Sequence, residues 1–212
     1  MTGMKTLAAV ALTAFAIPVQ PPAGQLATPP AVVLQNASVR VYRTMADVLT
    51  RVPHGPGVVV WLETSPPDQE VRVIWMDDVA APPALATTNG PVVAVQLLDR
   101  GAAGATAPPP SSESTRSDAQ FTGMKFVPVF DNSRAAVLRA HMDVDAREAF
   151  HTHGTDIVVV HLSGGEIEDI SNGKTVVNRW KPGDVEFEAR GSSHSARNVG
   201  GPIDVVLVQL KP

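Results

Sequence analysis

The chain has 212 residues, of which 44% are hydrophobic and 18% are charged, and its formal net charge is -4. This length is enough for one large or two small domains. No basic patch stands out, so we expect no nucleic-acid partner. The absence of cysteine excludes a cysteine zinc site and a disulfide scaffold, and any metal must therefore bind to histidine and carboxylate side chains.

The first residues have the pattern of a secretory signal peptide. Lys5 precedes the apolar run Thr6–Ile17, which is too short to span a bilayer as a mature helix. Ala14–Ala16 fits the small-x-small rule of a cleavage site, and Ala27 is an alternative site. We expect residues 1–27 to be a signal peptide and linker, and the mature chain to be secreted or periplasmic without membrane insertion. The alternative is a disordered soluble tail.

Most of the remaining sequence is typical of short β-strands. Valine-rich runs alternate with turns made by the 16 glycines and 19 prolines of the chain. Ser171–Lys174, which contains an Asn-Gly pair, and Lys181–Asp184 are examples of such turns. Short strands at even spacing predict an all-β sandwich or barrel.

The sequence contains an internal repeat. Four pairs of segments correspond in the same order: Asn36–Arg43 with Asn132–Arg139, His54–Leu62 with His153–Leu162, Trp75–Val79 with Trp180–Val185, and Gly90–Leu97 with Gly201–Leu210. Residues 100–120 are mostly Gly, Ala, Pro, Ser and charged residues, a composition that cannot bury a core and that predicts a linker. The repeat therefore predicts two modules, over residues 34–99 and 125–211.

Five of the six histidines lie in the second module: His141, His151, His153, His161 and His194. Residues two apart in a strand point to the same face, so His151 and His153 project together. His194 follows a turn at Gly191, on a later strand that can lie beside the first. Two ligands from one strand and one from another leave the far side of a metal ion open, as in a catalytic site rather than a closed structural one.

These residues resemble the two motifs of the cupin superfamily. Its second motif is G-x5-P-x-G-x2-H-x3-N. Gly183, Gly191, His194 and Asn198 match this motif at the family spacing, and Ala189 stands where proline is usual.

The first cupin motif, G-x5-H-x-H-x3–4-E-x6-G, is matched in part. Three of its residues are in place: His151, His153 and Gly164. Asp145 replaces the first glycine, and Ile157 or Val158 stands at the glutamate position, with Asp156 as the nearest carboxylate. The resemblance covers residues 125–211 directly and reaches residues 34–99 through the internal repeat.

The resemblance implies an all-β fold of two small cupin-like double-stranded β-helix (jelly-roll) barrels in tandem, as in bicupins. It also implies that the second barrel binds a divalent metal ion, Fe, Mn, Ni, Cu or Zn, on His151, His153 and His194. Asp156 is a candidate fourth ligand if a bulge shifts the facing of its strand. The alternative is a site of three histidines and water.

The first module departs further from the motifs. Val52 stands in place of the first histidine, Gly57 in place of Asp156, and residues 85–89 contain no histidine. Only His54 remains, so we expect no metal there. The expected role is structural, either packing against the second barrel or completing the surface of a homodimer.

The remaining polar residues have ordinary interpretations. His141 and His161 are typical of a strand face or a core, and Arg190 and Arg197 are either solvated or hold an anionic substrate. Three functions stay open: a metal-dependent enzyme of dioxygenase or isomerase type acting on a small molecule, a non-catalytic periplasmic or extracellular protein that binds a metal or small ligand, and a structural duplicate with no site.

Overall fold

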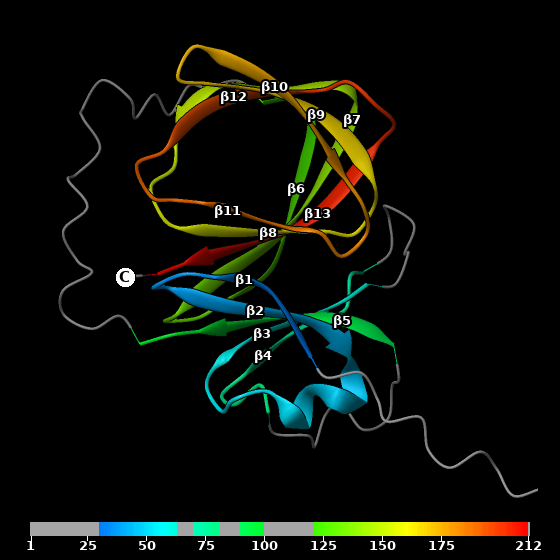
Figure 1. Cartoon of the computed structure of the whole chain (residues 1–212). Helices are drawn as coiled ribbons and strands as arrows, with labels where there is room; N and C mark the ends of the chain where they lie inside the picture. The colour runs from blue at the N-terminus through cyan, green and yellow to red at the C-terminus, as the bar shows by residue number, and fades with distance from the viewer. Residues whose placement is uncertain (1–29, 63–69, 81–89, 100–120, 212) are drawn as a thin grey trace, which may run out of the picture.

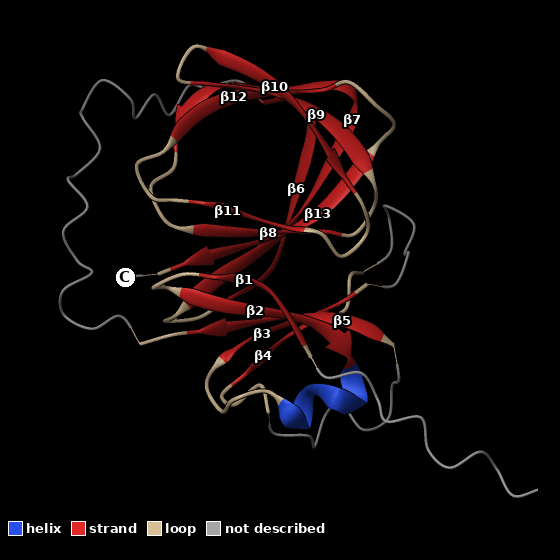
Figure 2. Cartoon of the chain, viewed as in Figure 1, coloured by secondary structure: helices blue, strands red, loops and turns tan. Residues whose placement is uncertain are grey.

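The computed structural model describes residues 30–62, 70–80, 90–99 and 121–211. Within these ranges the regular secondary structure is β-strand, apart from one short 3-10 helix, η1 (Ala46–Arg51) (Figure 2). The predicted all-β fold is confirmed. The predicted signal peptide (1–27) and linker (100–120) lie outside the described residues. No helix in the described ranges has the length and hydropathy needed to cross a membrane.

The C-terminal part of the chain forms one curled antiparallel sheet. Its strands are β6 (Phe121–Asp131), β7 (Ala135–Thr152), β8 (Ile157–His161), β9 (Gly165–Ser171), β10 (Lys174–Trp180), β11 (Val185–Glu188), β12 (Ser193–Asn198) and β13 (Ile203–Leu210). They pair in the order β10-β9-β12-β7-β13-β8-β11, and β6 pairs with β7. Figure 1 shows the sheet curling into a jelly roll, in which β9, β10 and β12 face β8, β11 and β13.

The long strand β7 belongs to both walls of this barrel. Its first half pairs with β13, where Ala135 lies opposite Leu210, and its second half pairs with β12, where His151 lies opposite His194. Asp145, between the halves, has a φ of 63°, in the left-handed region that non-glycine residues rarely adopt. This local distortion accompanies the bend that brings the C-terminal end of β7 into the second wall.

The N-terminal part forms a separate five-stranded antiparallel sheet in the order β1-β2-β5-β3-β4. The strands are β1 (Ala31–Gln35), β2 (Val39–Met45), β3 (Gly57–Trp61), β4 (Val73–Met76) and β5 (Pro91–Leu97). One face packs against the outside of the barrel wall (Figure 1), in a core shared by buried residues that include Val39, Val41, Val58, Val60, Val93 and Val95 of the sheet and Val137, Val158, Val160, Val206 and Val208 of the barrel. Burial of each valine side chain stabilises the folded protein by about 1.5–3 kcal/mol, so this shared core holds the two sheets together.

The internal repeat has a structural counterpart. The strand order β1-β2-β5-β3-β4 matches β6-β7-β13-β8-β11 strand for strand. Gln96 of β5 pairs with the first residue of β3, as Gln209 of β13 pairs with the first residue of β8. The side chains of Asn36 and Asn132 accept hydrogen bonds from the backbone N–H groups two and three residues later, at 2.8–3.0 Å. The N-terminal sheet therefore repeats one half of the barrel.

A second closed barrel over residues 34–99 is not confirmed, because the described residues there form one open sheet. In the barrel, residues 162–184 lie between β8 and β11 and contain β9 and β10. The matching segment, residues 62–72, has 11 residues where the barrel has 23. It also contains Pro66 and Pro67, which cannot donate hydrogen bonds to a strand ladder.

Two details of the expected alignment are wrong. Trp75 of β4 lies opposite Val58, as Phe187 of β11 lies opposite Val158, so Trp75 corresponds to Phe187 and not to Trp180.

The counterpart of Asp156 also differs from the expected one. The backbone N–H of Leu210 donates to the carbonyl of Asp156, and that of Leu97 donates to the carbonyl of Pro56, both at 2.8 Å. Pro56, rather than Gly57, therefore stands at the position of Asp156.

Candidate metal centre

The structure brings the three predicted histidines together inside the barrel. His151 and His153 come from the end of β7, and His194 comes from the neighbouring strand β12. One ring nitrogen of each histidine lies within 4.8 Å of those of the other two. Their ring centroids are 4.7–5.0 Å apart, so the rings form a nearly equilateral triangle.

Neighbouring groups fix the orientation of these rings. The Nδ1 of His194 lies 2.9 Å from a carboxylate oxygen of Asp169, and the Nδ1 of His151 lies 2.9 Å from the carbonyl oxygen of Ala149. In each of these two rings the Nε2 atom then carries a lone pair that a metal ion can accept, because a neutral imidazole that donates from Nδ1 has a lone pair on its other nitrogen. Such contacts to the second ring nitrogen are a regular feature of histidines that bind metals.

The spacing of two of the ring nitrogens suits a metal ion. The Nε2 atoms of His153 and His194 are 3.1 Å apart. Two nitrogens bound to one ion at about 2.0–2.1 Å are separated by roughly 2.9 Å at a right angle and roughly 3.4 Å at the tetrahedral angle. The observed distance lies between these values, so His153 and His194 are spaced to bind one divalent ion, with a ring nitrogen of His151 within 4.8 Å of both.

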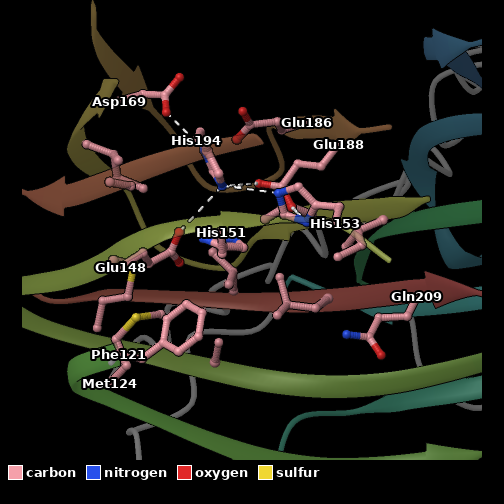
Figure 3. A pocket seen from close by; sticks show the side chains of 18 of the residues that line it. Phe121, Met124, Glu148, His151, His153, Asp169, Glu186, Glu188, His194 and Gln209 are labelled. Atoms are coloured by element: carbon pink, nitrogen blue, oxygen red, sulfur yellow. Dashed lines mark hydrogen bonds and ion pairs between the residues drawn. The ribbon is translucent and has the colours of Figure 1, made fainter. Parts of the chain in front are cut away.

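A carboxylate that the sequence did not single out lies beside the histidines. On β12, His194 pairs with His151 and Ala196 pairs with Glu148, so two steps along β12 correspond to three along β7. The extra residue is a β-bulge, which turns Glu148 to the same face as His151. Its Oε2 atom is 3.7 Å from the Nε2 of His194 (Figure 3). Glu148 thus lies beside the histidines as a candidate fourth ligand.

Two further glutamates project into the barrel from β11. Val185 and Phe187 pack against the core between the sheets, and the alternation of the strand turns Glu186 and Glu188 to the inside. The Glu188 carboxylate lies 3.5 Å from the Nδ1 of His153 through Oε2 and 3.9 Å from the Nε2 of His194 through Oε1. It therefore stands beside the histidine triad.

Burial changes the ionisation of these groups. Burial, with the nearby charges of Asp169 and Glu148, raises the pKa of Glu186 to about 7. Burial and neighbouring carboxylates, Glu186 foremost, raise the pKa of Glu188 to about 8. Burial also lowers the pKa of His153 to about 4, with smaller contributions from the other two histidines. His153 is therefore neutral at neutral pH and available as a ligand.

The structure does not place Asp156 with the histidines. It precedes β8, where the next residue, Ile157, lines the cavity. Asp156 instead accepts hydrogen bonds from the hydroxyl of Ser38 at 3.0 Å and from the backbone N–H of Arg190 at 2.8 Å. Its carboxylate connects the N-terminal sheet to the barrel, and no bulge on β8 turns it inward.

The histidines lie on a cavity of about 420 Å³ inside the barrel. Figure 3 shows His194 between Asp169 on one side and Glu148 on the other, with Phe121 and Met124 at another part of the cavity wall. Most of the remaining wall is apolar, with residues that include Phe126, Ala140, Met142, Val159, Ile167, Val205 and Leu207. The volume is that of a site for a small molecule.

The other predicted polar residues divide between the cavity and the surface. His161 is 1% exposed and lines the cavity, stacked on Trp180 with the ring centroids 4.5 Å apart. His141 lies outside the cavity, with its Nδ1 3.2 Å from Asp204. Arg190 and Arg197 do not line it either, and Arg197 pairs with Asp145. Neither arginine is placed to hold an anionic ligand in the cavity.

Comparisons with known proteins give structural matches. No family model matches the sequence, and no curated protein does. Among solved structures, the chain is similar to a cupin domain from Bordetella pertussis Tohama I (20% identity, 44% of this chain and 98% of that one, TM-score 0.41). It is also similar to a cupin superfamily protein from Desulfitobacterium hafniense DCB-2 (12%, 45% and 84%, TM-score 0.37) and to the polyketide cyclase RemF from Streptomyces resistomycificus (16%, 46% and 77%, TM-score 0.38). The fold class itself follows from the strand pairing of this chain.

Proposed function

We propose that the barrel binds one divalent metal ion and uses it to transform a small molecule. The observation that carries this proposal is the convergence of His151, His153 and His194, with nitrogens within 4.8 Å of one another, on an apolar cavity. Glu148 is the fourth candidate ligand. Imidazole and carboxylate donors suit Fe, Mn, Ni, Cu or Zn.

The proposed reaction is of dioxygenase or isomerase type. A divalent ion bound there would serve as a Lewis acid toward an oxygen of the substrate or as the site of dioxygen activation. Glu188, beside His153 and His194, is placed to give a proton to a bound molecule and to take it back, because burial raises its pKa to about 8 and leaves it largely protonated at neutral pH. Asp169 holds the His194 ring in position, and much of the surrounding wall is apolar.

The first test is the metal content of the natively purified protein, measured by elemental mass spectrometry. We expect about one divalent ion per chain. Oxygen consumption should then be followed with a panel of diols and β-diketones, using the same preparation before and after removal of the metal by a chelator. Turnover that disappears with the metal and returns when the metal is restored supports the enzyme. A stoichiometric ion without turnover on any substrate favours the alternative, a non-catalytic binding protein.

We also propose that the protein is exported, on the basis of Lys5 and the apolar run Thr6–Ile17. Mass spectrometry of the periplasmic or secreted protein is expected to show a new N-terminus between Ile17 and Thr28. Recovery of the chain with an intact Met1 from the cytosol would contradict this proposal.

A further inference from the structure

The polar lining of the cavity contains acidic side chains and no basic ones. The acidic residues are Glu148, Asp169, Glu186 and Glu188, and no lysine or arginine of the described residues lines the cavity. An anionic group placed between such walls loses its hydration and meets no cationic side chain, which is unfavourable. Away from the metal centre, the cavity is therefore unsuited to a carboxylate, sulfate or phosphate.

One polar group in the cavity lacks a partner. His161 is 1% exposed, and neither of its ring nitrogens has a hydrogen-bond partner among the described residues. Its Nε2 atom lies 4.0 Å from a carboxylate oxygen of Glu186, beyond hydrogen-bond distance. A buried polar group without a partner costs free energy, and a ligand that supplies the missing hydrogen bond recovers it. His161 therefore marks a position where a polar atom of a ligand is favoured.

Ionisation does not give His161 an anion-binding role. Burial lowers its pKa to about 4, an effect that nearby Asp184 partly opposes. The neutral ring offers one donor and one acceptor nitrogen, and it can bind a hydroxyl group in either direction. Trp180 stacks on the His161 ring at an interplanar angle of 16° and so restricts the orientation of that ring.

His161 lies away from the triad, along the same strands. On β8 and β11, Ile157 pairs with Glu188, the glutamate beside the triad. His161 lies four residues further along β8, or about 13 Å at 3.3 Å per residue. Apolar side chains such as Val159 and Leu207 line the cavity. With a metal bond of about 2 Å at one end and a hydrogen bond of about 3 Å at the other, a ligand roughly 8–10 Å long spans this distance.

We infer that the cavity takes a neutral, largely apolar small molecule, which binds the metal through one end and donates or accepts a hydrogen bond at His161 through a hydroxyl or carbonyl at the other. This inference rests on the proposed metal centre for the near end of the ligand. It excludes organic acids and phosphate esters whose acidic group points away from the metal.

The test uses matched probes on the metal-loaded full-length chain. Calorimetry compares 3-(3,4-dihydroxyphenyl)propan-1-ol with 3-(3,4-dihydroxyphenyl)propanoate, which share a catechol head for the metal and differ only in the distal group. The alcohol is expected to bind at least about tenfold more tightly, because the carboxylate must be desolvated among acidic side chains. Equal or tighter binding of the propanoate, or no binding of either probe to the loaded chain, would overturn the inference.

A variant isolates the contribution of the far end. His161→Phe keeps a flat ring against Trp180 but removes both nitrogens, and it should abolish the preference for the alcohol over 4-propylcatechol. His54→Phe is the matched control, because this side chain is 83% exposed in the loop before β3, outside the cavity, and it should leave the preference unchanged. Melting temperature and metal content verify that both variants fold. A preference that survives in a folded His161→Phe variant contradicts the far-end site.

A metal-free arm separates this inference from the proposed function. After chelation, the chain is titrated with 3-phenylpropan-1-ol and 3-phenylpropanoate, which have no catechol head, and binding is followed by NMR. Preference for the alcohol, lost in His161→Phe, supports the far-end site even where the native protein proves to bind no metal. Absence of that preference in a chain that binds one metal ion leaves the metal centre intact and rejects the far-end site.

Discussion

Replacing His151 and His153 together with alanine is expected to abolish stoichiometric metal binding. These residues supply two of the three imidazoles of the site, and the remaining His194 cannot hold an ion against dialysis by itself. Each single His→Ala change should also release the ion on dialysis, since a three-histidine site that loses one ligand keeps few contacts. Elemental mass spectrometry of the dialysed variants measures the effect, and retention of one ion per chain by the double variant would refute the site.

The two candidate carboxylates provide a sharper comparison within the same prediction. Glu148→Gln is expected to weaken metal binding by about tenfold to a hundredfold if the carboxylate contacts only the histidine ligands. The loss should be larger if the carboxylate binds the ion itself. Asp156→Asn is the matched control and should leave the affinity nearly unchanged, because its side chain contacts Ser38 and the backbone of Arg190. The opposite ranking would restore Asp156 as a ligand and exclude Glu148.

Val95→Asp is expected to destabilise the whole protein severely. Val95 is fully buried in the core between the N-terminal sheet and the barrel. The change removes about 1.5–3 kcal/mol of apolar burial and adds several kcal/mol for an unpaired buried charge. That total approaches the 5–15 kcal/mol stability of a typical domain, so thermal unfolding should shift by more than about 10 °C or lose its cooperativity.

Val176→Asp is the matched control for this substitution. Val176 lies on the edge strand β10 and is 53% exposed, so the same change in chemistry should alter the melting temperature by only a few degrees. Circular dichroism melts of the two variants give the comparison. If Val95→Asp melted like Val176→Asp, the two sheets would not be packed together through this core.

The histidine triad was predictable because its signal is local and regular. Alternation along a strand places His151 and His153 on one face, and the spacing around His194 matched a known motif. Glu148 was missed because it lies three residues before His151, which in a regular strand means the opposite face. Only the bulge between His194 and Ala196 reverses this, and nothing in the sequence marks a bulge there.

The glutamates of β11 were missed for a related reason. The alternation Val185-Glu186-Phe187-Glu188 is usually interpreted as a strand with its apolar face inward and its acidic face in solvent. Here the apolar face packs on the neighbouring sheet, so the acidic face is the one inside the barrel. The second barrel is not confirmed: the repeat preserves strand order and turn residues, but its segment between β3 and β4 is much shorter than the one that forms β9 and β10.

The N-terminal sheet of the same chain already covers the outer face of the barrel wall formed by β8, β11 and β13. That face is therefore not free to bind a second copy, and a homodimer, which the sequence leaves open, must form through another surface. Because one polypeptide carries both sheets, their association depends on an effective local concentration and not on the concentration of the protein. The packing of the N-terminal sheet on the barrel therefore persists on dilution, whereas the same contact between two separate subunits would be lost.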